Sequence, residues 1–352
     1  MEKIGKTANA SQASLVIFVK MLHLDRLSLT NFKNIEQAEL DLSPRVNCFT
    51  GNNGSGKTNL LDAVHYLCMT KSFFSSNAAH HIRLEFEPDF FIVQGDFTRG
   101  RKKDTVFCGY KRNQGKQFKR NKVDYERLSD HIGLFPVVMI SPYDTDLINQ
   151  GGEERRKFMD SIISQYDKDY LVSLIAHNKA LQQRNALLKQ FQQKGGFSRD
   201  LLEIYDQQLI EHGNIIFKKR YDFIMLFVVD FQHYYDMISR ATEKVNINYK
   251  SHCLGESMEW SLETGLEKDR IMGHTTQGIH RDDLEFSIKD RPIRKFGSQG
   301  QQKSMLIALK LAKQAFICEE AKVKPILLLD DIFDKLDERR IRHLLDIIKD
   351  ED

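Results

Sequence analysis

The chain has 352 residues, of which 41% are hydrophobic and 29% charged, so it can form one large core or two smaller ones. Its net charge of +3 neither requires nor excludes nucleic acid. The longest apolar run, residues 223–229, is far too short to span a membrane, and the five cysteines lack metal-site or disulfide spacing. We therefore expect a cytoplasmic protein with no membrane partner, whose cysteines are reduced thiols in the core.

The first elements in chain order are strands. Residues 1–20 contain too short an apolar core for a signal peptide, and we expect them to be an extension without function. From residue 22 to residue 50, apolar and polar residues alternate in short runs that predict strands, the last of them at residues 46–50. A helix is predicted from about residue 58 to 67. Residues 90–140 return to short strands and end in the apolar run 137–140.

The middle of the chain is predicted to be helical. From residue 153 to about 190, apolar residues recur at four-residue steps and predict one helix; its stripe is Phe158, Ile162, Tyr166, Tyr170 and Leu174. Gly195 and Gly196 end it, and a second helix is predicted over about 199–239. The two would form an antiparallel pair that projects from the sheet domain or packs beside it. A strand resumes near Val245, and the last elements are a helix, a buried strand and a helix.

These elements predict an α/β fold with a mainly helical insertion. The sheet-containing lobe would comprise residues 21–145 and 270–352, and the helical lobe residues 146–269.

A phosphate-binding loop lies between the last predicted strand of the first group and the helix that follows it. Residues 51–58, GNNGSGKT, match GxxxxGK[ST] at every position. Its glycines let backbone N–H groups turn toward phosphate oxygens, and the helix N-terminus adds positive potential. Lys57 is expected to reach the β- and γ-phosphates of ATP, and the Thr58 hydroxyl to bind Mg²⁺. The predicted loop ligands are Gly51, Asn52, Asn53, Gly54, Ser55, Gly56, Lys57 and Thr58.

Two carboxylates near the C-terminus are the predicted second half of this site. The apolar run 326–329 predicts a buried strand, and Asp330 and Asp331 come at its carboxyl end, where parallel sheets bind ligands. Asp330 is the expected Mg²⁺ partner, and Asp331 is placed to orient or deprotonate the attacking water. Catalysis is therefore assigned to Asp331 and Lys57.

A third motif precedes that strand. Residues 297–301, GSQGQ, open a helical run, and a serine hydroxyl with glycine-freed N–H groups at a helix N-terminus forms an anion site. Its predicted ligands are Ser298, Gly300 and Gln301. The segment resembles the ABC signature motif in the form found in SMC-like and RecF-like ATPase heads, and Leu336 with Asp337 matches their D-loop. That resemblance implies a homodimer when ATP is bound, in which Ser298 acts on the nucleotide held by Lys57 of the other copy.

The spacing and several local sequences resemble the RecF family across residues 21–352. Lys57 and Ser298 are 298 − 57 = 241 residues apart, more than in transporter ATPase subunits and far less than in SMC proteins with coiled coils. The matching segments are NFKN at 31–34, NLLDA at 59–63, SPYD at 141–144, ERRKFMD at 154–160, QRN at 183–185 and GIHRDD at 278–283. Asp62 and Ile279 depart from the family's usual glutamate and proline. The family also continues past the last helix into a strand with a switch residue, so hydrolysis or stability is expected to suffer in a chain that stops at Asp352.

The resemblance implies a DNA-repair ATPase of recombination and replication restart. Its expected ligands are ATP and Mg²⁺, hydrolysis is slow, and its DNA is gapped, single-stranded or a duplex junction. A RecR-like mediator, recombinase loading and the SOS response are implied as well. The alternatives are an ATPase subunit of a transporter, against which the long insertion and a basic hairpin argue, and an SMC-like scaffold, against which the absence of heptads argues. A fused nuclease has no room after Asp331, and a metabolic kinase does not need the signature.

The resemblance also suggests roles for charged residues outside the motifs. Lys33 is a candidate nucleotide contact, and Gln150 is a weak candidate for the Mg²⁺-linked Q-loop residue. Arg155 and Arg156 would sense nucleotide or bind DNA, or else form a solvated helix start. Residues 280–283, HRDD, are either a nucleotide-coupled network or a charged turn.

A basic hairpin is the predicted DNA surface. Ten lysines and arginines and one acid, Asp104, lie between Arg99 and Lys122, interleaved with aromatic residues. Such side chains suit phosphate contacts that are independent of sequence and sensitive to salt; the alternative is a hairpin whose charges only aid solubility. The candidate DNA contacts are Arg101, Lys102, Lys103, Lys111, Arg112, Lys119 and Arg120.

Overall fold

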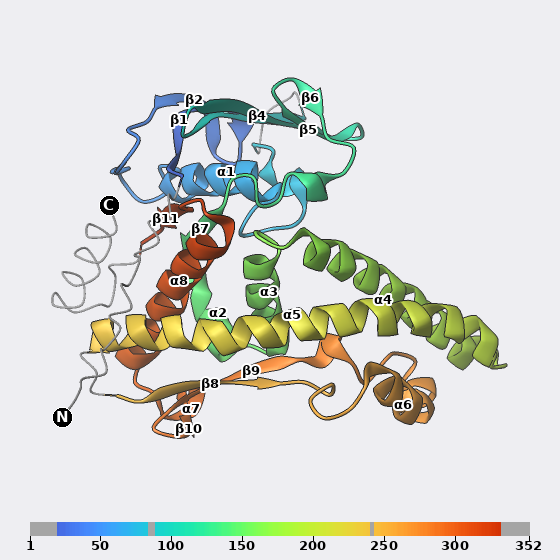
Figure 1. The fold of residues 1–352 in the computed structure, drawn as a ribbon. Helices are drawn as coiled ribbons and strands as arrows, with labels where there is room; N and C mark the ends of the chain where they lie inside the picture. The colour runs from blue at the N-terminus through green and yellow to red at the C-terminus, as the bar shows by residue number, and fades with distance from the viewer. Residues whose placement is uncertain (1–19, 84–88, 240–242, 332–352) are drawn as a thin grey trace, which may run out of the picture.

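The computed structural model of the chain describes residues 20–83, 89–239 and 243–331. Its upper part in Figure 1 is an antiparallel sheet of six strands in the order β2-β1-β3-β4-β5-β6. The strands are β1 (Leu22–Phe32), β2 (Ile35–Asp41), β3 (Phe90–Arg99), β4 (Lys102–Lys111), β5 (Gly115–Arg120) and β6 (Val123–Asp124). Along β3 every second side chain is buried, which is the pattern of a sheet with one covered face.

Helix α1 (Lys57–Met69) covers that face, directly after the phosphate loop. A side chain at Gly95 of β3 would place its Cβ 2.7 Å from Leu67 of α1, so glycine at this position allows the helix to approach the sheet. The predicted helix 58–67 is confirmed. Two 3₁₀ turns, Ala78–His81 and Leu128–Asp130, border this lobe.

A parallel pair of strands lies below α1 in Figure 1. Strand β7 (Val137–Ile140) pairs with β11 (Ile326–Leu329), in a register that sets Val137 opposite Ile326. All four β7 residues are buried, as expected for a strand covered on both faces. The pairing brings the carboxyl end of β11, with Asp330, to the phosphate loop.

The segment before the phosphate loop is not a strand, contrary to our prediction for residues 46–50. The Asn47 side chain instead accepts from the backbone N–H of Ser43 and donates to its carbonyl, each at 2.8 Å. Such local bonds compete with strand pairing, and in the described part of the chain β7 and β11 pair only with each other. Val46 is 70% exposed.

The helical part begins with α2 (Asp146–Asn149), α3 (Gly152–Ile163), α4 (Lys168–Lys194) and α5 (Arg199–Ser239). The prediction of a single helix over 153–190 is therefore wrong, because α3 ends at Ile163 and α4 begins only at Lys168. Asp167 caps α4 by accepting from the Tyr170 N–H, at 2.9 Å. Tyr166 lies between α3 and α4 but still packs on Phe316. The apolar stripe therefore continues from one helix to the next, and the four-residue periodicity does not reveal that the helix is interrupted.

The predicted helix pair is confirmed. Helices α4 and α5 lie side by side and project to the right in Figure 1, with α6 (Met258–Met272) below their far end. The remaining elements are η3 (Pro142–Thr145), β8 (Val245–Lys250), η4 (Ile279–Arg281), β9 (Asp283–Ile288), β10 (Arg291–Pro292), α7 (Ile293–Phe296) and α8 (Gln299–Ala321). Strands β8 to β10 form a small antiparallel sheet, and α8 packs along α5.

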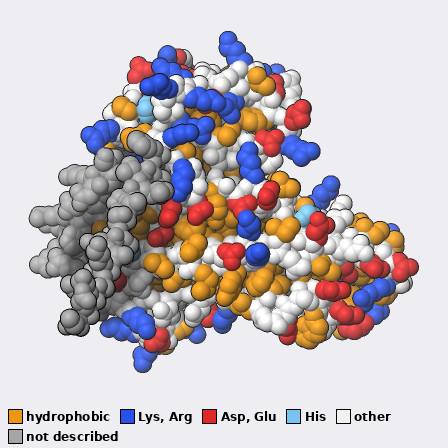
Figure 2. All heavy atoms as spheres, in the orientation of Figure 1, with side chains coloured by type: hydrophobic (Ala, Val, Ile, Leu, Met, Phe, Trp, Pro, Cys, Tyr) orange, Lys and Arg blue, Asp and Glu red, His pale blue; other side chains and the backbone are white. Residues whose placement is uncertain are grey.

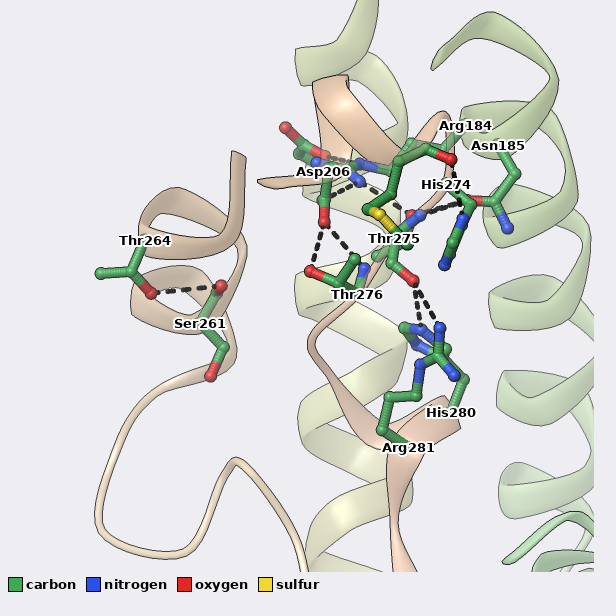
Figure 3. A network of polar contacts seen from close by, with 12 residues as sticks. Arg184, Asn185, Asp206, Ser261, Thr264, His274, Thr275, Thr276, His280 and Arg281 are labelled. Carbon is green, nitrogen blue, oxygen red and sulfur yellow. Dashed lines mark hydrogen bonds and ion pairs between the residues drawn. The ribbon is translucent and has the colours of Figure 1, made fainter. Parts of the chain in front are cut away.

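A buried arginine joins the helices of the insertion. Arg184 of α4 pairs with Asp206 of α5 and Asp269 of α6, both at 2.6 Å, and donates to Thr275 at 2.8 Å. Figure 3 shows Arg184 between these elements, with His280 directed at the same turn. Arg184 thus links three helices, and α6 is also held by its buried residues Met258 and Leu262 and by the Gln192 bond to the Ile271 carbonyl.

The cysteine prediction is only partly right. Cys68, Cys108 and Cys253 are buried, and burial raises the pKa of the Cys108 thiol to about 12. Cys48 is exposed, because it lies in the segment that fails to form a strand, and Cys318 is half-buried. Among the described helices, none is both long and apolar enough to cross a bilayer.

Candidate nucleotide-binding site

The phosphate loop ends at Gly56, where the backbone enters α1. Gly56 has φ +99°, and a Cβ there would lie 3.0 Å from the Asn34 side-chain oxygen, so both conformation and space require glycine. The loop is mostly exposed, and the first backbone N–H groups of α1 face it. This is the arrangement that binds phosphate at a helix N-terminus.

Lys57 lies over the loop. Its ammonium group donates to the carbonyl oxygens of Gly51 at 2.8 Å and Asn52 at 2.9 Å. The ammonium group could donate to phosphate oxygens instead of these carbonyls with little motion, since carbonyl and phosphate oxygens are both hydrogen-bond acceptors. The residues present therefore fit a nucleoside triphosphate.

Thr58 and Asp330 meet although they are 272 residues apart. The Thr58 hydroxyl donates to Asp330 Oδ1 at 2.8 Å. Burial raises the pKa of Asp330, and the Thr58 hydrogen bond and Lys57 oppose that rise. A hydroxyl beside a carboxylate is an oxygen pair that Mg²⁺ accepts, with phosphates and waters as its other ligands. The predicted metal residues thus lie together.

Asp331 follows at the end of β11. Its side chain is exposed, and its backbone has φ +46°, a left-handed conformation that aspartate tolerates better than most residues. The chain therefore turns directly after Asp330, and the Asp331 charge still helps to raise the pKa of the Asp330 carboxyl. Leu336 and Asp337, the predicted D-loop, lie outside the described residues.

Asn34 is a loop contact that our sequence analysis missed. It donates from Nδ2 to the Gly54 carbonyl at 2.8 Å and accepts from Asn59 at 2.7 Å. Lys33, the predicted nucleotide contact, instead bonds buried Asp62 at 2.6 Å. Lys33 and Asn34 are adjacent in the NFKN segment, and nothing in a single sequence tells which of the two faces the loop.

The signature segment is folded as predicted. Ser298 caps α8: its hydroxyl accepts from the Gln301 N–H at 3.2 Å, and its own N–H donates to the Gln301 side-chain oxygen at 2.8 Å. This reciprocal capping box orders the first turn of α8, which includes Gly300. Ser298 is exposed, whereas Gln301 is half-buried.

Arg155 and Arg156 bind the turn before β9. Arg155 forms a bidentate pair with Asp283 at 2.6 and 3.0 Å, and Arg156 donates to the Asp282 carbonyl at 2.8 Å. Gln150 contributes only its carbonyl, which accepts from Arg155.

Asp282 is fully buried and accepts from Arg220 at 2.7 Å and Tyr249 at 2.6 Å. His280 Nε2 contacts the Thr275 carbonyl at 3.0 Å. Within residues 280–283, Asp282 is therefore buried in a hydrogen-bond network, whereas Arg281 is exposed. A coupling of this network to nucleotide stays a prediction.

The basic candidates on the hairpin divide into two groups. Arg120 and Lys102 pair with Asp104, Arg112 pairs with Asp89, and Lys119 pairs with Asp124. The other candidates have exposed side chains; they are Arg101, Lys103 and Lys111. Figure 2 shows lysine and arginine side chains over this lobe, interspersed with acidic ones.

A phosphate loop, an acidic strand end and a signature helix in this order define an ATPase head of the ABC class. The family described as "RecF/RecN/SMC N terminal domain" matches residues 23–352. An Smc head domain from Pyrococcus furiosus shares the fold, with a TM-score of 0.53 and 17% identity over 94% of this chain and 87% of that one.

More similar relatives identify the branch. The DNA replication and repair protein RecF of Phocaeicola vulgatus is 48% identical over 327 residues, which cover 92% of this chain and 87% of the relative. That of Flavobacterium johnsoniae is 46% identical over 330 residues, 94% and 91% of the two chains. A solved structure of the recombination mediator protein RecF with ATP, in the RecFOR pathway, has a TM-score of 0.87 and 31% identity over 94% of this chain and 90% of that one. The chain belongs to the RecF family.

Proposed function

We propose that this protein is an ATP-operated clamp on DNA. Two copies join head to head with ATP between them and close on gapped DNA or on a single-strand/duplex junction. Slow hydrolysis of ATP then releases the clamp. The observation that carries the proposal is the Thr58–Asp330 hydrogen bond, which unites the phosphate loop with the acidic strand end, next to Lys57.

Each residue of the site has a separate task in this proposal. Lys57 and the loop N–H groups bind the β- and γ-phosphates, and Thr58 with Asp330 would hold Mg²⁺, which neutralises phosphate charge. Asp331 orients or deprotonates the attacking water. Ser298 of the second copy contacts the γ-phosphate, so that ATP bridges the two subunits.

The cellular role is proposed from the relatives. Proteins at 46–48% identity are named for DNA replication and repair, and a solved relative is a mediator in the RecFOR pathway. We infer a RecR-like partner, support of recombinase loading and a contribution to the SOS response. A transporter subunit or an SMC-like scaffold does not account for these relatives.

The DNA surface is proposed to lie on residues 99–122, which form β4, β5 and the turns before and after β4. Arg101, Lys103 and Lys111 are exposed cations at or next to the two ends of β4. Arg120 serves mainly to neutralise Asp104, which is 3% exposed.

Fluorescence anisotropy of a labelled gapped DNA, with ATP and with ADP across a salt series, tests the proposal. ATP should tighten binding, and Lys57→Ala should abolish that effect. Changing Arg101, Lys103 and Lys111 together to glutamine should lower the salt slope by about 2 to 3, since each phosphate contact contributes about 0.9. The matched control changes three exposed lysines of the helical hairpin and α6 to glutamine: Lys189, Lys194 and Lys268. DNA binding that is equal in ATP and ADP would contradict the clamp, and an unchanged slope would contradict the hairpin surface.

A further inference from the structure

The signature helix has a contact that its capping box does not explain. In the box, Gln301 uses its side-chain oxygen to accept from the Ser298 N–H. Its other end, the NH₂ group, donates to Glu243 Oε1 at 2.5 Å. Glu243 belongs to the segment between α5 and β8, 58 residues away, so a distant part of the fold reaches the first turn of α8.

Glu243 is itself held by α5. Its second oxygen, Oε2, accepts from the Tyr235 hydroxyl at 2.7 Å. Tyr235 is fully buried and packs against Phe231 one turn earlier, at 6.1 Å between ring centroids. A continuous series of hydrogen bonds therefore runs from the core of α5 through Glu243 and Gln301 to Ser298.

The chemistry of the series fixes one orientation of Gln301. The oxygen and nitrogen of a side-chain amide are nearly equal in shape, so its hydrogen-bond partners decide which end points where. A carboxylate only accepts. With Glu243 on one side, the NH₂ group must face it, and the amide oxygen must face the Ser298 N–H.

We propose that Glu243 is a positioning residue of the signature segment. It acts through Gln301 to keep Ser298 and the N-terminus of α8 in the conformation that meets nucleotide held by a second copy. This inference deepens the proposed function and rests on it for its consequence. Because the series starts on α5, it also ties the signature segment to the longest helix of the insertion.

Loss of Glu243 should loosen the first turn of α8 and leave the phosphate loop intact. The capping box would then form only part of the time, and loss of such a cap typically changes the equilibrium between the ordered and frayed first turn by roughly two- to thirtyfold. Lys57 and Thr58 have other partners and should still bind ATP in the monomer.

Two measurements on the full-length chain test the assignment, with Glu203→Ala as control because Glu203 is exposed near the other end of α5. The first is amide hydrogen exchange of residues 298–303 in the nucleotide-free protein. Glu243→Ala should speed it about fivefold or more, with residues 51–58 unchanged. The second is sedimentation with ATP, in which Glu243→Ala should weaken dimerisation at least fivefold while the monomer's affinity for a fluorescent ATP analogue stays within twofold.

A double variant that exchanges the hydrogen-bond donor and acceptor between positions 301 and 243 distinguishes this positioning role from a simple loss of packing. Gln301→Glu alone sets two carboxylates against each other and should also speed exchange. Adding Glu243→Gln restores the bonds of this series, because the amide then donates to position 301 and accepts from Tyr235. The double variant should return to within twofold of the wild-type exchange rate.

The outcomes distinguish the inference from the proposed function. If the wild-type protein does not dimerise with ATP, the proposed clamp fails, and the exchange measurements still decide whether Glu243 orders the signature. Unchanged exchange in Glu243→Ala, or equal exchange in Gln301→Glu with and without Glu243→Gln, would overturn the inference.

Discussion

Single residues at the nucleotide site differ in their burial and in their bonding partners. Thr58 and Asp330 are joined by a hydrogen bond at the buried end of β11, where Mg²⁺ would be held. Asp331 is one residue further, exposed and with a left-handed backbone conformation. Lys57 is bound to loop carbonyls and is available to phosphate. Loss of Asp331 should therefore have a different effect from loss of Lys57.

Asp331→Asn should leave ATP binding within about threefold and lower hydrolysis roughly 10²- to 10⁴-fold, the usual contribution of a positioned acid–base group. Equilibrium binding of a fluorescent ATP analogue and single-turnover phosphate release measure the two effects. Lys57→Ala is the comparison, because it should lose binding itself. Wild-type hydrolysis in Asp331→Asn would remove this residue from the mechanism.

Buried histidines make the folded state sensitive to acid. Burial lowers the pKa of His177 to about 3, and of His131 and His280 to about 4. In the unfolded chain a histidine has a pKa of about 6.5, so below that pH the unfolded state binds protons that the folded state does not. Stability is therefore fully present above pH ~6.5 and is lost as the pH falls toward 4, on the order of 1–3 kcal/mol for each histidine.

His177→Leu should reduce the slope of unfolding free energy against pH between about pH 6 and 4.5 by up to ~1.4 kcal/mol per pH unit. Urea denaturation at a series of pH values measures it. His233→Leu, at an exposed position of α5, is the control. If both variants keep the wild-type slope, burial of His177 does not contribute to the acid response.

At the scale of elements, two fully buried arginines join the helices. Arg184 binds acids of α5 and α6, and Arg220 of α5 binds Asp160 of α3 and Asp282 beside β9. Such buried pairs add little to the net stability of the fold, because desolvation of the charges offsets most of their attraction. Each arginine instead adds directional bonds between elements that are also joined by apolar packing.

Arg184→Met should destabilise the protein by about 3–5 kcal/mol, because Asp206 and Asp269 are left without their counter-charge. Arg199→Ala, which removes an exposed pair at 3.8 Å with Glu263, should cost less than about 1 kcal/mol. Urea denaturation of both variants gives the comparison. Equal effects would show that burial of Arg184 carries no special weight.

Contiguous motifs were predictable, and distant polar pairs were not. The loop at 51–58 and the acidic strand end could be predicted from local sequence, because each is a local arrangement of backbone and side chain. The signature could be predicted from its position between them and its resemblance to a family motif. Asn34 and Glu243 gave no such signal, since their roles depend on residues far away in sequence. The break between α3 and α4 was missed because Asp167 interrupts the backbone without interrupting the apolar stripe.

At the scale of the whole molecule, the fold keeps the phosphate loop and the signature helix on different elements. The loop precedes α1, under the six-stranded sheet, whereas Ser298 begins α8, which packs along α5. An ATP-joined dimer would use both surfaces of each copy, so that each complete site takes its loop from one copy and its signature from the other. On this proposal the active unit is therefore the dimer.

Complementation between two inactive variants shows whether each site takes its residues from both chains. Lys57→Ala and Ser298→Arg should each fail to dimerise with ATP and to hydrolyse it. Mixed in equal amounts, they can form one complete site, from the loop of the Ser298→Arg chain and the signature of the Lys57→Ala chain. The account predicts that sedimentation with ATP shows a mixed dimer and that hydrolysis recovers to a measurable fraction, at most about half, of the wild-type rate. A mixture as inactive as its components, beside a wild-type protein that dimerises and hydrolyses ATP, would contradict it.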